Sequence, residues 1–334
     1  MKALVTGGTG FLGSALVRAL AVGGHSVRVL ARPRSDRRAL AGVAGLEIVE
    51  GDLRDPASLV RAVAGADVVF HAAGLYALWV KDEADFFEVN VRGAEALMRA
   101  AKDAKVSRVV HTSTTATIGI DESGGAASED ATFNLGSYNE PYTNSKREGE
   151  ARVLAMAKEG LPVVVVNPSA PVGEWDWKPT PTGELVLKFM KRQIPFYSQG
   201  GLSPVDAADV VRGHLLALER GRVGERDILA GENMTYKEIF GSLEDVTGLR
   251  APLLPAPPPL VNATGWAMSV FSRATGLRVP LTRAAARLAS VNMFFSSDKA
   301  KRDLGYTISP LRGQGGALAR ACAWYRANGY VKSR

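Results

Sequence analysis

Six short apolar runs, separated by helix-length stretches, are the feature that most constrains the fold of this chain. They are rich in Val, Ile and Leu and nearly continuous, as strands covered on both faces should be. They read KALVT (2–6), HSVRVLA (25–31), LEIVEGD (46–52), ADVVFHAAG (66–74), SRVVHTST (107–114) and LPVVVVNP (161–168). Strand alternating with helix predicts an α/β fold, a Rossmann-type doubly wound parallel sheet, over residues 1–170.

The pattern changes after Pro168, and residues 171–334 are predicted to form a smaller, mixed and mainly helical substrate lobe. Part of 205–232 is expected to return to the first domain. The stretch 171–204 reads as irregular because five prolines interrupt it. Further along, the sequence predicts a helix over 206–221, a short strand over 226–231, a capped helix start at Thr235 with Glu238, a stiff connector over 252–260 and a last helix near 311–327.

Composition argues against several classes of protein. There is no apolar run of ~18 residues, so no membrane-spanning helix is expected. One cysteine and four scattered histidines do not predict a disulfide or a metal site. The net charge is +7, but no basic stripe carries interleaved aromatic residues, so nucleic-acid binding is not favoured. We expect a cytoplasmic protein without stable membrane insertion; weak membrane contact by residues 258–271 is an alternative to a buried helix there, and the buried helix is favoured.

A glycine-rich turn directly follows the first predicted strand. Gly7, Gly10 and Gly13 stand three residues apart in TGGTGFLG, before an amphipathic helix. A dinucleotide-binding turn needs glycine for the tight bend, for close approach to the pyrophosphate and for helix–strand packing. The helix N-terminus then offers free N–H groups to the phosphates. The sequence therefore predicts a nicotinamide dinucleotide site here.

The second strand favours NADP over NAD. Sites specific for NAD usually carry an acid at the end of this strand, and Ala31 stands there instead, with Arg32 next and Arg37 close behind. Arginine suits a 2′-phosphate through bidentate hydrogen bonds. NAD remains possible. Asp52, after the third strand, is predicted either to bind the adenine edge or to be an ordinary loop acid.

A tyrosine and a lysine stand four residues apart in YTNSK, on one face of a predicted helix. This helix and the hydroxyl-rich end of the fifth strand, HTSTTAT, both reach the carboxyl edge of the sheet, where the nicotinamide should lie. We predict that Tyr142 is the proton donor of a hydride-transfer site. Lys146 is expected to hold the nicotinamide ribose and to lower the pKa of Tyr142.

The chain resembles the extended short-chain dehydrogenase/reductase (NAD-dependent epimerase/dehydratase) family over nearly its whole length. Besides the motifs above, the resemblance rests on GDLRD, HAAG, VNVRGAEAL, YTNSKREGE, NPSAPVG, VDAADVVRGHLLALE and FSSDKAKRDLGY. It is most similar to the branch of dihydroflavonol-4-reductase-like proteins and hopanoid-associated sugar epimerases. The resemblance implies a homodimer packed through helices of the dinucleotide domain.

The resemblance also implies roles for individual residues. Tyr142 corresponds to the catalytic acid/base, Lys146 to its partner and Asn90 to a supporting asparagine. The active-site hydroxyl falls on Thr114, where serine is commoner, with Ser113 and Thr115 as rivals. The cofactor-binding set implied by motif and resemblance is Gly7, Thr9, Gly10, Phe11, Leu12, Gly13, Arg32, Arg37, Asp52, Leu53, Ala72, Ala73, Gly74, Tyr142, Lys146, Pro168 and Ser169.

The second half favours a reductase over an epimerase. Nucleotide-sugar epimerases bind a diphosphate, usually with arginines in the second lobe, and the leading arginine and histidine of their common segment are missing from GGLSPVDAADV. The predicted substrate residues are instead aromatic: Tyr76, Trp79, Trp175 and Tyr197. Apolar linings suit an apolar ketone or aldehyde. The alternatives are an epimerase or dehydratase that retains NAD, and a non-catalytic cofactor-sensing protein.

Overall fold

The continuous apolar runs pair into one parallel sheet in the computed structural model, which describes residues 1–77, 80, 82–138, 140–277, 279 and 281–331. The strands follow the order β10-β6-β5-β4-β1-β2-β3. Their bounds are β1 (Lys2–Thr6), β2 (Ser26–Ala31), β3 (Glu47–Glu50), β4 (Val68–His71), β5 (Arg108–Thr112), β6 (Val163–Pro168) and β10 (Arg226–Leu229). Strand order reverses between β1 and β4, which creates the crevice where ligands bind in such sheets. The predicted fold class is confirmed.

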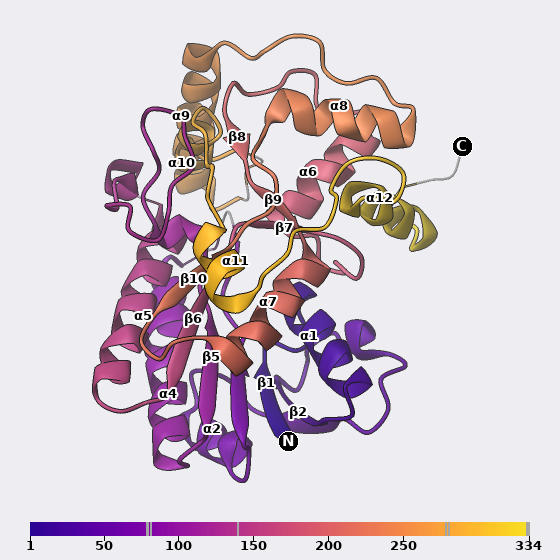
Figure 1. The fold of residues 1–334 in the computed structure, drawn as a ribbon. Coiled ribbons are helices and arrows are strands. Elements are labelled where there is room, and N and C mark those ends of the chain that lie inside the picture. Colours follow the sequence, from indigo (N-terminus) through magenta and orange to yellow (C-terminus); the bar gives the residue numbers. More distant parts are fainter. Residues whose placement is uncertain (78–79, 81, 139, 278, 280, 332–334) are drawn as a thin grey trace.

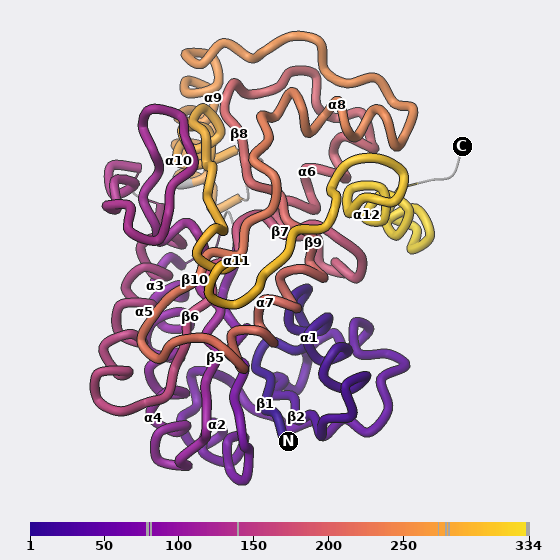
Figure 2. The backbone as a smooth tube through the Cα atoms, in the orientation of Figure 1, coloured from indigo at the N-terminus to yellow at the C-terminus, as the bar shows by residue number. Residues whose placement is uncertain are grey.

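Helices cover both faces of this sheet (Figure 1). On one face α1 (Phe11–Val22), α7 (Ala207–Arg220) and α11 (Asp298–Leu304) bury apolar side chains against it. On the other face α2 (Pro56–Val63), α4 (Ala94–Asp103) and α5 (Pro141–Lys158) do the same. The short α3 (Ala84–Phe87) and a π-helical turn (Glu88–Gly93) precede α4. Within 205–232, therefore, β10 joins the sheet and α7 packs against it. Figure 2 shows this later segment of the chain lying beside the N-terminal strands and helices.

The remaining strands and α-helices form a lobe above the carboxyl edge of the sheet (Figure 1). They are β7 (Ala170–Val172) paired with β9 (Pro204–Asp206), β8 (Gly201–Leu202) paired with β11 (Met234–Thr235), and the helices α6 (Pro181–Met190), α8 (Tyr236–Thr247), α9 (Pro258–Thr275), α10 (Arg283–Leu288) and α12 (Ala317–Ala327). α6, α8 and α12 share a buried apolar core of their own. The predicted capping box at Thr235 and Glu238 is confirmed, with the side chain of each bonding the backbone of the other.

Three predictions about this half were wrong. The stretch 171–204 is not wholly irregular, because α6 begins at Pro181 behind the N-cap Thr180, whose side chain accepts from Gly183 N–H. The last helix begins at Ala317 instead of near 311, after a stretch that holds Gly313, Gly315 and Gly316. The helix at 258–271 is not buried: most of α9 is exposed. None of the described helices is long and apolar enough to cross a membrane.

Candidate active site

The glycine turn packs tightly against the end of β4. Gly7 adopts a φ of +72°, and a Cβ there would stand 2.6 Å from backbone atoms of Ala72 and Ala73. A Cβ on Gly13 would stand 2.1 Å from the carbonyl oxygen of Gly7. Only glycine permits this approach of strand, turn and helix, so the two segments predicted to border the pyrophosphate lie side by side.

The N-terminus of α1 is open to a ligand. Its N-cap, Gly10, is exposed, no side chain caps the helix, and the first turn carries no acid. Thr9, Phe11 and Leu12, also predicted to bind cofactor, are half-buried around it. Free N–H groups and the positive end of the helix dipole suit a phosphate, so this cradle fits the pyrophosphate of a dinucleotide.

The arginines after β2, where the adenosine of a dinucleotide is expected, differ in whether they already have a partner in the protein. Arg32 is exposed, and no ion pair involves it in the part of the chain that the structure describes. Arg37 pairs instead with Glu50, at 3.2 Å, an acid whose Cα is in register with Ala31. Reasoning from the second strand alone missed this acid, because β3 supplies it.

Asp52 also has a partner. Its side chain accepts hydrogen bonds from Arg54, at 3.0 Å and 3.1 Å, and the guanidinium of Arg54 lowers the pKa of the carboxyl. Leu53 is buried beside it. The side chain of Asp52 keeps an exposed fraction of 27%, so an oxygen can still reach a ligand. The structure therefore leaves both predicted roles of Asp52 open.

The catalytic candidates converge where β5 meets the first turns of α5. Lys146 is 6% exposed, and its Nζ donates to the carbonyl oxygen of Thr112 at 2.8 Å. Burial lowers the pKa of Lys146 to about 8, while the charge of Glu150 acts to raise it. Lys146 is therefore still largely protonated at neutral pH. It also lies close to Gly74: a Cβ added to Gly74 would stand 4.0 Å from the Nζ of Lys146.

Tyr142 differs from the prediction in one respect. Enclosure by protein raises its pKa well above the ordinary value, and Tyr76 raises it further. A hydrogen bond with Thr114 acts to lower it, whereas Lys146 is not among the causes. The expectation that Lys146 lowers this pKa is thus not met in the structure, because Lys146 is engaged with Thr112. A raised pKa keeps the phenol protonated, which suits a proton donor.

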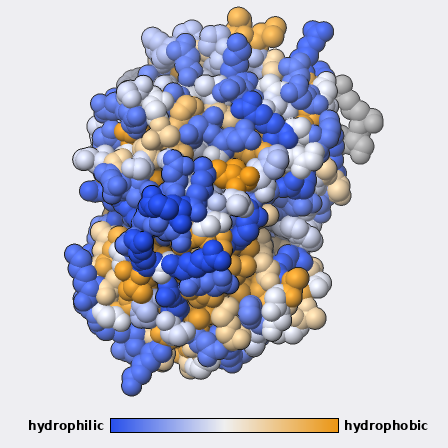
Figure 3. Space-filling view, viewed as in Figure 1, coloured by the Kyte–Doolittle hydropathy of each residue, from blue (hydrophilic) through white to orange (hydrophobic). Residues whose placement is uncertain are grey.

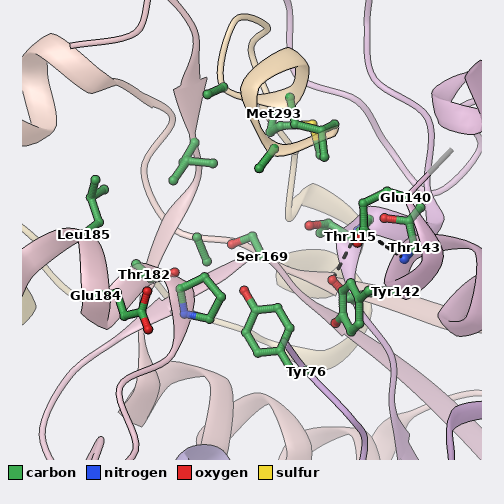
Figure 4. Close-up of a pocket in the computed structure, with 18 of the residues that line it drawn as sticks. Tyr76, Thr115, Glu140, Tyr142, Thr143, Ser169, Thr182, Glu184, Leu185 and Met293 are labelled. Carbon is green, nitrogen blue, oxygen red and sulfur yellow. Dashed lines mark hydrogen bonds between the residues drawn. The ribbon is translucent and has the colours of Figure 1, made fainter. Parts of the chain in front are cut away.

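The three candidate hydroxyls in HTSTTAT, those of Ser113, Thr114 and Thr115, have different surroundings. Thr114 contacts the Tyr142 hydroxyl and lines the cavity described below. Thr115 lines the same cavity (Figure 4). Ser113 is 6% exposed, does not line the cavity, and its Oγ has no hydrogen-bond partner among the described residues. The geometry favours Thr114 of the three.

Asn90 ties the loop after β4 to α5. It lies in the π-helical turn, a distortion that is frequent at functional sites. Its Oδ1 accepts from Leu75 N–H at 2.8 Å, and its Nδ2 donates to the Leu75 carbonyl at 3.2 Å and to Ser145 Oγ at 3.0 Å. All three bonds go to structural groups, so Asn90 holds the backbone of Leu75, next to Tyr76, against α5.

A cavity of about 340 Å³ opens beside Tyr142 (Figure 4). Tyr76 lines it, with its ring centroid 4.9 Å from that of Tyr142. Ser169 also lines it and hydrogen-bonds the Ser203 carbonyl, whereas the neighbouring Pro168 ends β6. Apolar walls come from the lobe: Leu185, Leu202, Leu281, Leu288, Met293 and Phe295. The arrangement suits a substrate with an apolar body and one reactive oxygen at its Tyr142 end.

Two predicted substrate residues lie elsewhere. Trp175 adopts a φ of +73° and stacks under the guanidinium of Arg18, 3.8 Å from it, over α1. Tyr197 packs on the core of the lobe and bridges to Pro255. Neither side chain lines the cavity, because Trp175 is held over α1 and Tyr197 against the core of the lobe. Trp79 lies outside the described residues.

The sequence reasoning missed Glu140. It caps α5, accepting from Thr143 N–H at 2.6 Å, and lines the cavity two residues before Tyr142. Burial raises the pKa of its carboxyl. The Glu140–Pro141 pair in EPYTNSK is a helix-start signal that could have located it. Groups of three or more His, Cys, Asp or Glu that could hold a metal ion do not occur in the described ranges.

Known proteins resemble this chain over nearly all of its length. The sequence model of the NAD dependent epimerase/dehydratase family matches residues 3–231. A protein of Synechocystis sp. named putative dihydroflavonol 4-reductase is 36% identical, over 99% of this chain and 96% of its own. Sterol demethylase protein B of Methylococcus capsulatus is 36% identical, over 99% of this chain and 100% of its own. The solved structure of a nucleoside-diphosphate-sugar epimerase from Pseudomonas aeruginosa has a TM-score of 0.82 at 27% identity, over 99% of both chains.

Proposed function

The chain belongs to the NAD dependent epimerase/dehydratase family, a family of extended short-chain oxidoreductases, and from that premise we propose that it is an NADP(H)-dependent carbonyl reductase. Its substrate is a ketone or aldehyde on a largely apolar small molecule. The observation that carries this proposal is the cavity in which Tyr142 and Thr114 stand at one end of a mainly apolar wall. The reductase and sterol-related names of the relatives support it.

Each residue has a role in this proposal. The bound nicotinamide supplies the hydride. The Tyr142 hydroxyl donates its proton to the substrate oxygen, and the raised pKa keeps that proton in place until then. Thr114 orients the same oxygen through its hydroxyl. Lys146 keeps a positive charge next to the site, because its pKa of about 8 lies above neutral pH. Arg32 binds the 2′-phosphate that distinguishes NADP from NAD.

A nucleotide-sugar epimerase is the second candidate, supported by the family description and by the similarity to the Pseudomonas structure. Lys188 and Thr182, from α6, line the cavity and could meet a polar ligand. An epimerase regenerates its cofactor in each turnover and would retain NAD. A reductase must exchange oxidised for reduced cofactor and would bind NADPH reversibly.

Cofactor retention separates these functions. The purified protein is denatured and any released dinucleotide is identified by chromatography, while protein freed of nucleotide is titrated with NADPH and NADH. We expect reversible binding with preference for NADPH. Retained NAD would support the epimerase, and binding of neither would support a non-catalytic protein. With a turned-over carbonyl substrate in hand, Tyr142→Phe should abolish turnover while leaving NADPH binding intact; full turnover would remove Tyr142 from its role.

A further inference from the structure

Helix α9 presents an apolar surface to solvent. Seven of the fourteen exposed large hydrophobic side chains of the described chain belong to residues 253–277. They are Leu253 and Leu254 before the helix, Leu260, Trp266, Val270 and Phe271 on it, and Leu277 after it, with exposed fractions from 47% to 85%. In Figure 3 a hydrophobic group stands at the upper edge of the molecule, over the connection between α8 and α9. So much clustered apolar surface indicates a binding partner.

The charge of this segment has one sign. Between residues 250 and 297 the sequence holds five arginines and no aspartate, glutamate or lysine. Arg283, at the start of α10, is exposed, and Arg287 stacks on Tyr138 at 4.5 Å. An exposed apolar segment whose own charges are all arginines complements a surface that is apolar within and anionic at its boundary. A second copy of the chain fits less well, because a two-fold contact would bring the same arginines together.

A second cavity borders both this surface and the active-site cavity. It has a volume of about 610 Å³ and lies between α9, α10 and the segment before α5. Trp266 and Val270, both of the exposed cluster, line it together with Arg283. Glu140 and Thr282 line both this cavity and the catalytic one. The cavity beneath the exposed helix and the Tyr142 cavity therefore adjoin each other at Glu140 and Thr282.

We propose that α9 and its flanking residues dock on an anionic lipid surface and that substrate enters from the lipid through the second cavity. The helix lies in the interface with Trp266, Val270 and Phe271 among the acyl chains, and the arginines meet the headgroups. No described helix spans a membrane, so the contact is peripheral. The entry role rests on the proposed reduction of an apolar substrate, whereas the docking itself does not.

Vesicle flotation tests the docking with the full-length protein. Vesicles of phosphatidylcholine alone are compared with vesicles of phosphatidylcholine and phosphatidylglycerol, at low and high salt. We expect binding to the anionic vesicles that weakens with salt, because screening acts on the arginine contacts. Trp266→Ser combined with Phe271→Ser should lower the partition coefficient by about tenfold or more, since each large apolar side chain leaves the lipid. Single substitutions Val270→Ser and Val60→Ser are matched, because both valines are exposed but only Val270 is in the cluster.

The outcomes are distinguishable. The proposal stands if Val270→Ser weakens binding, Val60→Ser does not, and all variants bind NADPH with wild-type affinity. It is overturned if the wild type ignores anionic vesicles at low salt, or if the double variant binds them equally well. It is also overturned if the double variant only converts a dimer into a monomer in light scattering, since a second copy would then be the partner. Failure of the reductase proposal would instead appear as absent NADPH binding with vesicle binding intact.

Discussion

Glu150 anchors a buried network behind Thr114, and replacing it tests whether that network positions the active site. Glu150 is 3% exposed. Its Oε2 accepts from Asn167 Nδ2 at 2.8 Å, and the same amide donates to the Thr114 carbonyl at 3.0 Å. Its Oε1 accepts from Arg226 at 3.0 Å. One carboxylate thus joins α5, β6 and β10 to the backbone of Thr114.

The two substitutions should differ in size. Glu150→Gln keeps an oxygen for Asn167 but turns its amide towards Arg226, so it loses one charge-assisted bond, worth ~1.5–3 kcal/mol of the free energy of unfolding. Glu150→Ala leaves Asn167 and Arg226 without this acceptor and should cost ~3–5 kcal/mol. The lower ends of both ranges apply, because the Arg226 side chain is 28% exposed and water can reach it. Glu148→Gln is the control on the same helix: its exposed pair with Arg152 contributes about 0–1 kcal/mol.

Urea unfolding at pH 7 measures these differences as midpoint shifts at constant slope. A second measurement isolates the effect on the site. Because the charge of Glu150 raises the pKa of Lys146, Glu150→Gln should move the upper pH limit of NADPH binding from about 8 to lower pH. If Glu150→Gln is as stable as Glu148→Gln and its pH limit does not move, the network neither stabilises the fold nor tunes Lys146, and the reasoning is wrong.

Three further predictions follow from the same geometry. Gly13→Ala should lower NADPH affinity by roughly tenfold or more in a fluorescence titration, because its Cβ would stand 2.1 Å from a backbone oxygen. Gly241→Ala is the control: a Cβ there has no neighbour within 4 Å, so NADPH affinity should stay unchanged and the free energy of unfolding should rise by ~0.5–1 kcal/mol. Arg32→Ala should weaken NADPH binding and leave NADH binding unchanged; equal losses for both would refute the 2′-phosphate role. Burial lowers the pKa of His71 to about 3 and of His214 to about 4, so below pH 6.5 the unfolded chain takes up protons that the native state does not. The lowered pKa of each histidine should therefore reduce the free energy of unfolding by roughly 2 kcal/mol between pH 7 and pH 5, as measured by urea unfolding. His214→Gln should make that loss smaller.

The dinucleotide half of the fold could be predicted because local signals and packing agree there. Continuous apolar runs such as VVVV at 163–166 can be satisfied only by strands covered on both faces, and these residues are fully buried in β6. The spacing of Gly7 and Gly13 likewise encodes a contact that the structure shows directly. Sequence spacing also brought Tyr142 and Lys146 to one end of α5, since four residues make about one helical turn.

The lobe could not be predicted to the same depth, because its cavity is built from segments distant in sequence. Leu185 of α6 and Met293 before α11 face the same space, and nothing local to either residue indicates this. Trp175 misled the prediction for a related reason. Aromatic composition suggested a pocket, but the left-handed backbone at Trp175 and the guanidinium of Arg18 hold the ring over α1.

The pKa of Tyr142 depends on tertiary contacts that the spacing of residues in the sequence does not predict. An i, i+4 pair places lysine and tyrosine on one face, which predicts that the ammonium lowers the tyrosine pKa. In the folded chain the Nζ of Lys146 is drawn to the Thr112 carbonyl, and Thr112 in turn hydrogen-bonds His214 through its side chain. The lysine is thus held by β5, and enclosure dominates the pKa of the phenol. A phenol that keeps its proton before reaction fits the proton-donor role proposed for Tyr142.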